Sequence, residues 1–540
     1  MTAAQTTTAP RPSAVDVPTS AATARRRRAE AVAGTWIPLA FVVLGAGLRI
    51  RQYVFRRSLW NDEAALALNI VQRGFVDLLR PLRFQQGAPI GFLWVERAAV
   101  DVLGKNEYAL RLFPLLAGIA GLVLFALIAR RVLSPWATPF AVLLFAVLQP
   151  LVYYSTEVKQ YGVDVTAALL IAYMTLRLLD RPLTRRRALV WGGVGGATLF
   201  VSHPAALVLG ASGLALGLTL ARRHERQQLE QLAWGVGVFA AAFIVEYVVS
   251  LRNLSANQVL AAYWHDGYPP QPFHLDKTLA WIGGLPGRLV PDPLAVKHSV
   301  ALYVLAAVGL AGLAWRRPTV ALLLAGIVGA ALCAAFVRAY PVQWRLALYL
   351  VPFVLLAAAA AIDVVIHAPL PLRLLAIVPA AALVFVAVTP TSDALSAIGR
   401  PYTRTELRPV LEKLAARRHP GDLIYVHWTG LLLFDYYSPL LHLRRDGTLG
   451  FAPRAACDDG ASLARLENHR VWLVFAFPPG YDSADSAGAT LAHMDRLGTR
   501  LFQARARGHA EVDLYALSNR VTGPAPAPPH PGLCINPTSP

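Results

Sequence analysis

Long apolar runs alternate with short polar connections along most of this 540-residue chain. Crossing a bilayer as a helix takes about 20 mostly apolar residues, and the recurring runs approach or reach that length. The pattern therefore predicts an all-α polytopic membrane protein with about eleven transmembrane helices. We expect them near residues 36–49, 109–129, 136–153, 161–179, 187–203, 205–221, 232–250, 299–314, 319–336, 346–362 and 373–389.

Arginine is concentrated in every second connection between these runs. The connections concerned contain Arg130 and Arg131, Arg181 and 185–187, Arg222 to Arg226, Arg316 and Arg317, and Arg373. Cytoplasmic loops of membrane proteins carry an excess of Lys and Arg, so these connections should be cytoplasmic. The N-terminus would then lie inside and the C-terminal region outside. This pattern also accounts for the net charge of +19, without a nucleic-acid partner.

Composition divides the chain further. Residues 1–35 should be a disordered cytoplasmic N-terminus, because they begin with an Ala, Thr, Ser and Pro-rich stretch. Residues 36–390 form the expected membrane domain, with long outer loops at 50–108 and 251–298. Residues 391–521 should form an extracytoplasmic α/β domain, with a helix near 405–418 and strands near 422–427 and 471–477. The Pro-rich residues 522–540 should be a loose tail.

The first outer loop has helical periodicity in two places. Residues 62–80 and 89–103 place apolar side chains at helical spacing among charged ones, which predicts helices lying at the membrane surface. Residues 251–298 are rich in Pro, Gly and aromatic residues and predict an ordered loop or lid.

Composition also excludes several classes. Hydrophobic residues make up 56% of the chain and charged residues 15%, and three cysteines are too few for a disulfide framework or a Cys-based metal cluster. Cys457 and Cys534 would share an oxidising compartment and could pair, or both could remain free thiols. The sequence contains no phosphate-binding or zinc-protease motif. The abundance of Arg, Ala and Leu suggests a bacterial plasma membrane protein.

Two adjacent carboxylates, Asp62 and Glu63, follow the first predicted helix at the outer membrane surface. A carboxylate held there could act as a general base on an acceptor hydroxyl. The simpler alternative is a helix start, where acidic residues favour the helix dipole. Trp60 could anchor this turn at the level of the lipid headgroups.

A second polar group joins the third and fourth predicted helices. If residues 153–164 are helical, Glu157 and Asp164 share one face, together with Gln160 or Tyr161. A charge at membrane depth is costly, which favours a role in binding substrate; Lys159 would lie beside it. The alternative is an exposed turn with a weak Glu157–Lys159 pair.

Further candidates could bind an anionic phosphate at the outer surface. They are Arg111, His203, Arg338, Tyr340 and Arg345. Arg binds phosphate in a bidentate manner, but each arginine could instead extend to the interface, and His203 could be an ordinary helix-end residue. Carboxylates at 62, 63 and 157 could bind a divalent metal ion, although no ligand spacing requires one.

Four segments resemble the GT-C class of integral-membrane glycosyltransferases, and its bacterial relatives of protein O-mannosyltransferase and lipid A aminoarabinose transferase in particular. They are Leu-Trp-Asn-Asp-Glu-Ala at 59–64, Gln-Gln-Gly-Ala-Pro at 85–89, Glu-Tyr-Ala-Leu-Arg-Leu-Phe-Pro at 107–114 and Tyr-Ser-Thr-Glu-Val-Lys-Gln-Tyr at 154–161. The resemblance implies a polyprenyl-phosphate sugar donor, an acceptor hydroxyl on a glycan, lipid or protein, and action on the outer face. It places the general base on Asp62, the phosphate on Arg345 or Arg111, and Glu157 near the sugar or acceptor.

Three other functions remain open at this stage. An oligosaccharide ligase of the envelope would share the class. A secondary transporter would have polar residues deep in several helices, whereas the polar groups here lie at outer helix ends. A non-catalytic membrane scaffold would tolerate loss of Asp62. The sugar and the acceptor are not readable from the sequence.

Overall fold

The computed structural model describes residues 25, 28–255, 257–369, 375–443, 448–450, 468–476, 491–492 and 494–517. Cys457, Cys534 and residues 522–540 lie outside these residues, so their pairing and the loose tail stay predictions. Most of the expected disordered stretch at the N-terminus also lies outside them.

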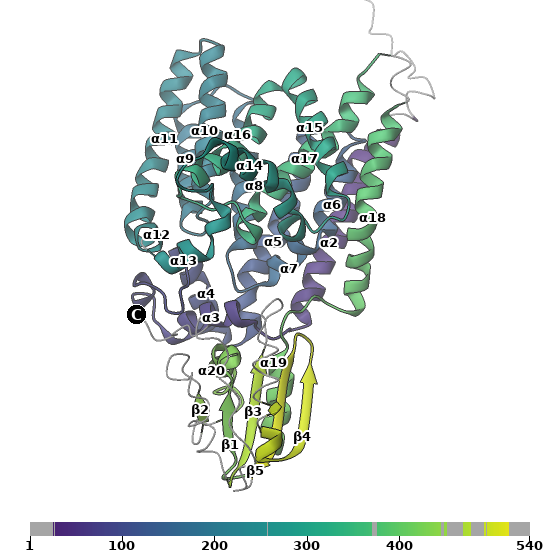
Figure 1. Ribbon diagram of the computed structural model, residues 1–540. Helices are drawn as coiled ribbons and strands as arrows, with labels where there is room; N and C mark the ends of the chain where they lie inside the picture. The colour runs from purple at the N-terminus through teal and green to yellow at the C-terminus, as the bar shows by residue number, and fades with distance from the viewer. Residues whose placement is uncertain are drawn as a thin grey trace, which may run out of the picture.

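A bundle of long helices forms most of the described chain (Figure 1). These helices are α2 (Ile37–Val54), α5 (Glu107–Val132), α6 (Thr138–Val147), α7 (Gln149–Tyr153), α8 (Tyr161–Leu178), α9 (Arg185–Leu199), α10 (Ala205–Arg222), α11 (Arg226–Glu246), α15 (Ser299–Arg316), α16 (Pro318–Phe336), α17 (Val351–Ile366) and α18 (Ile377–Gly399). The prediction of a polytopic helical membrane protein with a small C-terminal α/β domain is confirmed.

The number of membrane spans differs slightly from the predicted eleven. Among the described residues, nine helices are long and apolar enough to span, and α6 with the following helical turns makes a tenth, bent by 60°. The bend lies at Leu148, whose backbone leaves the helical conformation (φ −56°, ψ 121°), and Pro150 then occupies the first turn of α7. The one predicted segment that is not a candidate span is 187–203, which corresponds to α9, a helix of 15 residues. It is shorter than the roughly 20 residues that a spanning helix needs.

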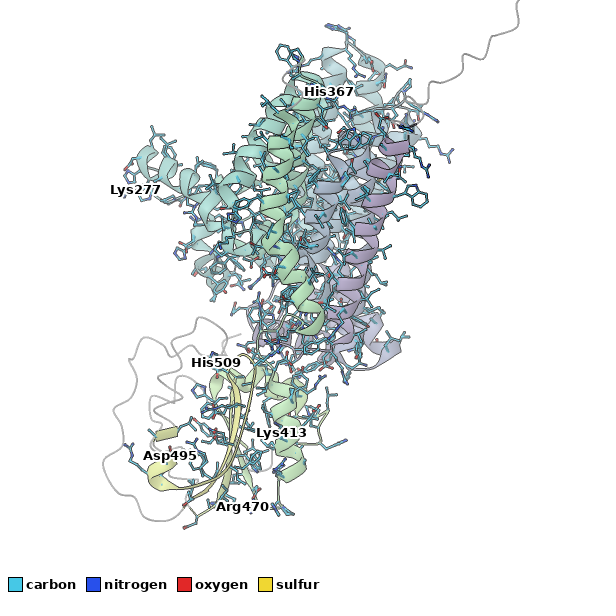
Figure 2. The ribbon with its side chains drawn as sticks, turned by 90° about the vertical axis from the view of Figure 1, so that its right-hand side faces the viewer. Lys277, His367, Lys413, Arg470, Asp495 and His509 are labelled. Atoms are coloured by element: carbon cyan, nitrogen blue, oxygen red, sulfur yellow. The ribbon has the colours of Figure 1, made fainter. Side chains whose placement is uncertain are left out.

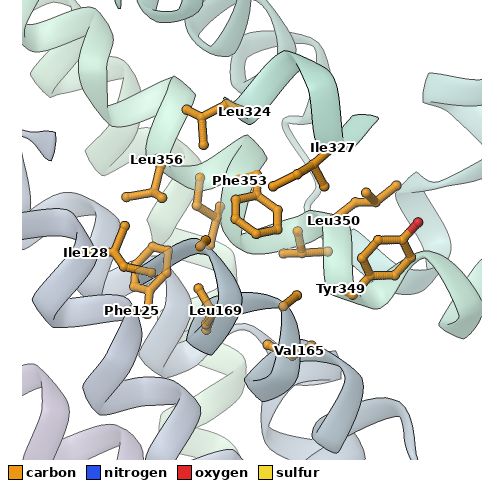
Figure 3. Packing of buried hydrophobic residues seen from close by; sticks show 14 of the residues in the cluster. Phe125, Ile128, Val165, Leu169, Leu324, Ile327, Tyr349, Leu350, Phe353 and Leu356 are labelled. Carbon is orange, nitrogen blue, oxygen red and sulfur yellow. The ribbon is translucent and has the colours of Figure 1, made fainter. Parts of the chain in front are cut away.

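The core of the bundle lies between α5, α8, α16 and α17. Figure 3 shows side chains from these helices, including Phe125, Leu169, Ile327 and Phe353, interlocked in one cluster. Each of these four side chains is at most 2% exposed. This packing fixes the helix ends that carry the polar residues discussed below.

The first outer loop lies between the bundle and the C-terminal domain. It forms α3 (Asn61–Gln72) and α4 (Ile90–Leu103), with one helical turn at Asp77–Leu79 between them. The helix predicted over 62–80 therefore ends earlier, because Arg73 adopts an extended conformation that stops α3. Pro89 is the residue before α4 rather than its first residue.

The second outer loop contains α12 (Arg252–Ser255), α13 (Gln258–Tyr263) and α14 (Leu275–Arg288). A π-helical turn, Tyr247–Leu251, joins α11 to α12, so the candidate span that begins at Arg226 continues to Leu254. This continuity places residues 249–254 at the end of a membrane span.

The C-terminal domain contains α19 (Leu407–Arg417), α20 (Leu431–Tyr437) and a five-stranded sheet. Its strands are β1 (Leu423–Val426), β2 (Thr448–Gly450), β3 (Arg470–Ala476), β4 (Gly498–Ala506) and β5 (Ala510–Leu517) in the order β2-β1-β3-β5-β4. β1 pairs in parallel with β2 and β3, whereas β5 pairs antiparallel with β3 and β4. The hairpin β4–β5 was not predicted from the sequence.

Hydrogen bonds join the C-terminal domain to the start of the first loop. The Glu406 carboxylate accepts from the backbone and hydroxyl of Ser58, both at 3.0 Å. The Tyr437 hydroxyl accepts from the backbone N–H of Leu59 at 2.8 Å. Figure 2 shows this domain at one end of the molecule, with His509 near the junction, and His367 at the opposite end. The domain therefore rests on the loop that carries Asp62.

Candidate active site

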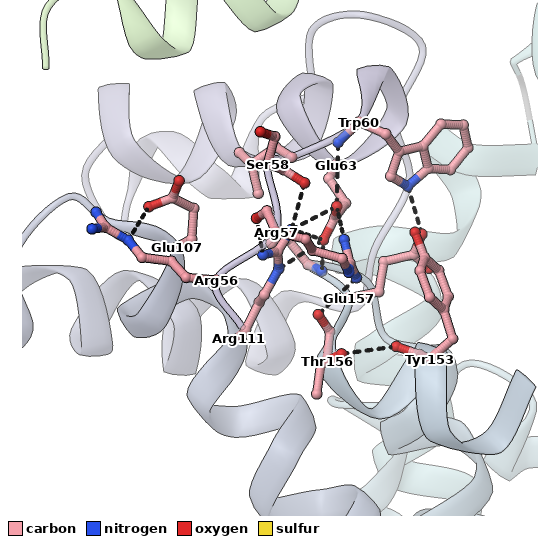
Figure 4. A network of polar contacts seen from close by, with 12 residues as sticks. Arg56, Arg57, Ser58, Trp60, Glu63, Glu107, Arg111, Tyr153, Thr156 and Glu157 are labelled. Atoms are coloured by element: carbon pink, nitrogen blue, oxygen red, sulfur yellow. Dashed lines mark hydrogen bonds and ion pairs between the residues drawn. The ribbon is translucent and has the colours of Figure 1, made fainter. Parts of the chain in front are cut away.

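A buried ion cluster holds the start of α3. Glu63 is fully buried, and its carboxylate contacts Arg57 at 2.6 Å and Arg111 at 2.8 Å (Figure 4). It also accepts a hydrogen bond from the backbone of Val158 at 2.9 Å. Burial alone would raise the pKa of Glu63, but the two guanidinium groups outweigh it and lower that pKa below its usual range. Glu63 thus links three segments of the chain.

This arrangement corrects the expectation that Arg111 faces a substrate phosphate. Its side chain is 3% exposed and donates to Glu63 and to the backbone carbonyls of Arg57 and Ser58. A guanidinium that is buried and bonded in this way shapes the loop rather than opening onto a ligand. Glu63, the second catalytic candidate of the pair, likewise points into this buried ion cluster.

Asp62 points out of this cluster and remains partly accessible. Its side chain is 19% exposed, Oδ1 lies 3.0 Å from Lys159 Nζ, and Oδ2 lies 2.9 Å from Arg345 Nη2. Gln86 Nε2 donates to the same Oδ1 at 3.3 Å. Burial acts to raise the pKa of Asp62, but Lys159 and Arg345 outweigh it and lower the value to about 2. Asp62 is therefore ionised at neutral pH.

Arg345 is surrounded by aromatic rings as well as by Asp62. Its guanidinium carbon lies 5.5 Å from the Trp60 ring, 5.5 Å from Tyr161 and 5.3 Å from Trp264. Its Nε donates to the Tyr161 hydroxyl at 2.9 Å. Arginine stacks on aromatic faces while keeping its donors directed at anions, so the rings hold the guanidinium in place while its Nη2 pairs with Asp62.

Glu157 is a fully buried carboxylate beside these groups. Its Oε1 accepts from Trp60 Nε1 at 2.6 Å, whereas Oε2 has no hydrogen-bond partner among the described residues. Burial raises the pKa of Glu157, and Arg404 is the main opposing influence. Arg404 stacks on Trp60 at 4.0 Å and donates to the Tyr154 hydroxyl at 3.2 Å.

The segment 153–164 is not one continuous helix. A short 3₁₀ turn, Tyr154–Thr156, is followed by Glu157 in an extended conformation, and α8 begins only at Tyr161. The common helical face expected for Glu157 and Asp164 therefore does not exist. Instead, Lys159 and Tyr161 reach the Asp62 group, while Asp164 is 3% exposed in the first turn of α8. Gln160, immediately before α8, is 7% exposed.

The remaining candidates lie away from Asp62 or on the surface. His203 Nε2 lies 3.4 Å from Glu246 Oε1, where α10 meets α11. Arg338 is exposed and stacks over Tyr268 at 4.8 Å. The Tyr340 hydroxyl donates to the carbonyl of Leu346 at 3.2 Å, which supports the turn before α17. Of the predicted site residues, the structure brings together Asp62, Glu157, Lys159, Tyr161 and Arg345.

Two members of the site were not predicted as functional. Gln86 belongs to the segment 85–89, which resembles the GT-C class but received no functional assignment from the sequence. It contacts both Asp62 and Lys159. Arg404 lies in the connection to the C-terminal domain, far from the motifs along the chain, and no local pattern marks it. Among the described residues, no group of three or more His, Cys, Asp or Glu is arranged to hold a metal ion.

Comparison with known proteins finds a family match over part of the chain. Residues 87–249 match the family described as dolichyl-phosphate-mannose-protein mannosyltransferase. No sequence among the curated proteins matches this chain. The match covers less than a third of the chain and agrees with the predicted resemblance to the GT-C class of membrane glycosyltransferases.

Two solved structures are similar to this chain over most of its length. One is ArnT from Cupriavidus metallidurans bound to undecaprenyl phosphate, with 16% identity, coverage of 90% of this chain and 99% of that one, and a TM-score of 0.48. The other is the archaeal oligosaccharyltransferase AglB from Archaeoglobus fulgidus with an inhibitory peptide and a dolichol-phosphate. Its identity is 14%, its coverage is 90% of this chain and 74% of that one, and its TM-score is 0.44.

Proposed function

We propose that this protein transfers a sugar from a polyprenyl-phosphate donor to an acceptor hydroxyl on the outer face of the membrane. The observation that carries the proposal is the Asp62 carboxylate, 19% exposed and held between Lys159 and Arg345. Such a transfer needs a base for the acceptor proton and a cation for the departing phosphate, close to each other. Asp62 and Arg345 are in direct contact and could fill these two roles. The family match adds a class of enzyme named for a lipid-phosphate sugar donor.

The proposed reaction assigns one role to each side of Asp62. The acceptor oxygen bonds to the anomeric carbon of the sugar and gives its proton to Asp62. The bond from that carbon to the phosphate oxygen breaks, and its electron pair stays on the polyprenyl phosphate. Arg345 would bind this leaving group, because a guanidinium matches the oxygen geometry of a phosphate.

The low pKa of Asp62 has a consequence for this scheme. A carboxylate whose pKa is about 2 is ionised but weakly basic while Arg345 and Lys159 face it. An anionic phosphate bound to Arg345 would offset that cation and raise the pKa of Asp62. Donor binding would thus make Asp62 a better base just before the acceptor proton is transferred.

The distribution of charge supports activity on the outer face. The connections around Arg131 and Arg317 meet at one end of the bundle, where Arg317 donates to the backbone of Arg131 at 2.7 Å. His367 lines one cavity with Arg317 at this end, and the C-terminal domain lies at the end opposite to His367 (Figure 2). By the positive-inside rule, Asp62 and the C-terminal domain would then face outward.

Binding of undecaprenyl phosphate to the purified protein tests the proposal. Arg345→Gln should weaken binding by about 10–100-fold, because a hydrogen bond to a charged group contributes about 1.5–3 kcal/mol. Arg338→Gln is the matched control: the same substitution, seven residues earlier along the chain, on an exposed side chain stacked over Tyr268. Equal affinities for the two variants would remove the phosphate role of Arg345.

A further inference from the structure

Arg404 reaches the candidate active site from the connection between α18 and α19. Its guanidinium carbon lies 4.0 Å from the centre of the Trp60 ring and 5.2 Å from that of Tyr153, and its Nη2 donates to the Tyr154 hydroxyl at 3.2 Å. Tyr154 in turn donates to Asp292 of the second outer loop at 2.6 Å. One arginine beside the C-terminal domain thus joins the first loop, the turn before α8 and the second loop.

Trp60 is the residue through which Arg404 can affect Asp62. It is the N-cap residue of α3, two positions before Asp62. Its indole Nε1 donates to Glu157 at 2.6 Å, and its backbone N–H donates to Glu63 at 3.3 Å (Figure 4). A cation over the face of a tryptophan ring is attracted to it, so the guanidinium holds the ring while the two carboxylates hold its edge and its backbone. The position of the turn that carries Asp62 therefore depends on these three contacts.

The connection that carries Arg404 is held on both sides. On the membrane side, the Gln52 amide of α2 donates to the Tyr402 carbonyl at 2.6 Å and accepts from the Tyr402 N–H at 3.0 Å. On the side of the C-terminal domain, the Glu406 N–H donates to the carbonyl of Arg507 at 2.9 Å. Arg507 follows β4, in the turn that leads to β5. The backbone around Arg404 is thus fixed between the first membrane helix and the β4–β5 turn.

Gly508 brings the β4–β5 turn directly against the backbone of Arg404. Its φ is +71°, and an added Cβ would lie 1.6 Å from the Arg404 carbonyl oxygen and 2.7 Å from the Thr405 Cα. Backbone atoms cannot turn aside as the end of a side chain can, so this approach requires glycine. Figure 2 shows the next residue, His509, at the junction of the domain with the rest of the molecule. The turn therefore determines where the backbone of Arg404 lies.

We propose that the C-terminal domain completes the candidate active site, because its β4–β5 turn holds Arg404 in contact with Trp60 and Tyr154. Arg404 is a positioning residue, which acts through Trp60 on the turn that carries Asp62. The inference rests on the proposed function and adds a form of control to the same site. Turnover depends on the docked position of a domain that lies outside the helical bundle.

Replacement of Arg404 tests the positioning role in the full-length protein. Arg404→Gln should lower the kcat of sugar transfer about 10–100-fold, because a displacement of about 1 Å in a site can cost about 100-fold. Arg404→Lys keeps a cation near the Trp60 ring and should recover part of this loss. The affinity for undecaprenyl phosphate should stay within about threefold of the wild type in both variants, because Arg345 keeps its contacts with Asp62 and Tyr161.

Gly508→Ala tests the route through the domain and should lower kcat about fivefold or more. Gly421→Ala is the matched control: Gly421 has a φ of +93° in the same domain, but an added Cβ there would meet no other described group within 4 Å. In the Arg404→Gln protein, Gly508→Ala should lower kcat by less than about twofold further, because changes that act through one residue are not additive. If Gly508→Ala does not fold, Gln52→Leu, which frees the other side of the connection, replaces it in both measurements.

Several results would overturn the inference and leave the proposed function standing. They are a wild-type kcat in Arg404→Gln, an equal kcat in Gly508→Ala and Gly421→Ala, and fully additive losses in the double variant. A loss of undecaprenyl phosphate affinity in parallel with kcat would also overturn it, because Arg404 would then bind the donor itself. The proposed function fails on different grounds, namely when the wild type transfers no sugar or when donor binding does not depend on Arg345.

Discussion

Replacement of Glu63 by Gln should damage the fold, whereas the same kind of replacement at Asp62 should damage chemistry. Glu63 is fully buried and compensates two arginines, Arg57 and Arg111, whose side chains are at most 3% exposed. Glu63→Gln keeps the shape of the side chain but leaves both guanidinium groups without their counter-charge. Removing one partner of a buried ion pair costs about 3–5 kcal/mol of unfolding free energy.

Thermal unfolding of the purified protein, followed by tryptophan fluorescence, measures this loss. The Glu63→Gln protein should melt well below the wild type, or lose its cooperative transition. Asp62→Asn should lose less stability than Glu63→Gln, because Asp62 is 19% exposed whereas Glu63 is fully buried, although the partners of Asp62, Lys159 and Arg345, are only 4% and 8% exposed. A Glu63→Gln protein with wild-type melting and no transfer activity would refute the structural role and make Glu63 a chemical group.

Two further expectations concern topology and acid stability. Reporter fusions after residues 225 and 400 should report opposite sides of the membrane; the same side for both would contradict the map. Burial lowers the pKa of His427 from 6.5 to about 3, so between these values the unfolded chain binds a proton that the folded chain does not. His427 should then contribute a fall in the unfolding free energy of about 1.4 kcal/mol per pH unit below pH 6.5. His427→Gln should remove this contribution in melting experiments, and a slope equal to that of the wild type would exclude it.

Most of the fold follows from patterns that are local in sequence. Apolar runs locate the long helices, because a bilayer demands about 20 apolar residues per span. A short apolar run likewise predicted a strand at 422–427, where the structure has β1 (Leu423–Val426). It missed the β4–β5 hairpin, since β4 alternates exposed and partly buried residues and carries several arginines. It also ran the helix at 136–153 through the bend at Leu148.

The site was only partly predictable, because its contacts join distant segments. Asp62 and Lys159 could each be singled out from motifs, but nothing local shows that their charged atoms lie 3.0 Å apart. The sequence could not separate Asp62 from Glu63, since adjacent helical residues point in different directions and only the fold decides which direction is buried. Arg404 reaches the site because the C-terminal domain docks on the first loop, which is a long-range event without a local signal.

The most direct test of the account is sugar transfer by the Asp62→Asn protein from a polyprenyl-phosphate sugar donor to acceptors in the membrane fraction. Protein yield and melting temperature are matched to the wild type. Loss of a general base should slow transfer by about 10²–10⁴-fold. Asp77→Asn and Asp101→Asn are the controls, because these carboxylates are about half exposed, at 53% and 43%, and pair with arginines of the same loop, Arg80 and Arg97. Both should keep near wild-type rates, since surface substitutions usually change stability by less than about 0.5 kcal/mol. Near wild-type transfer by Asp62→Asn would contradict the account, because Asp62 would then be only a residue at the start of a helix.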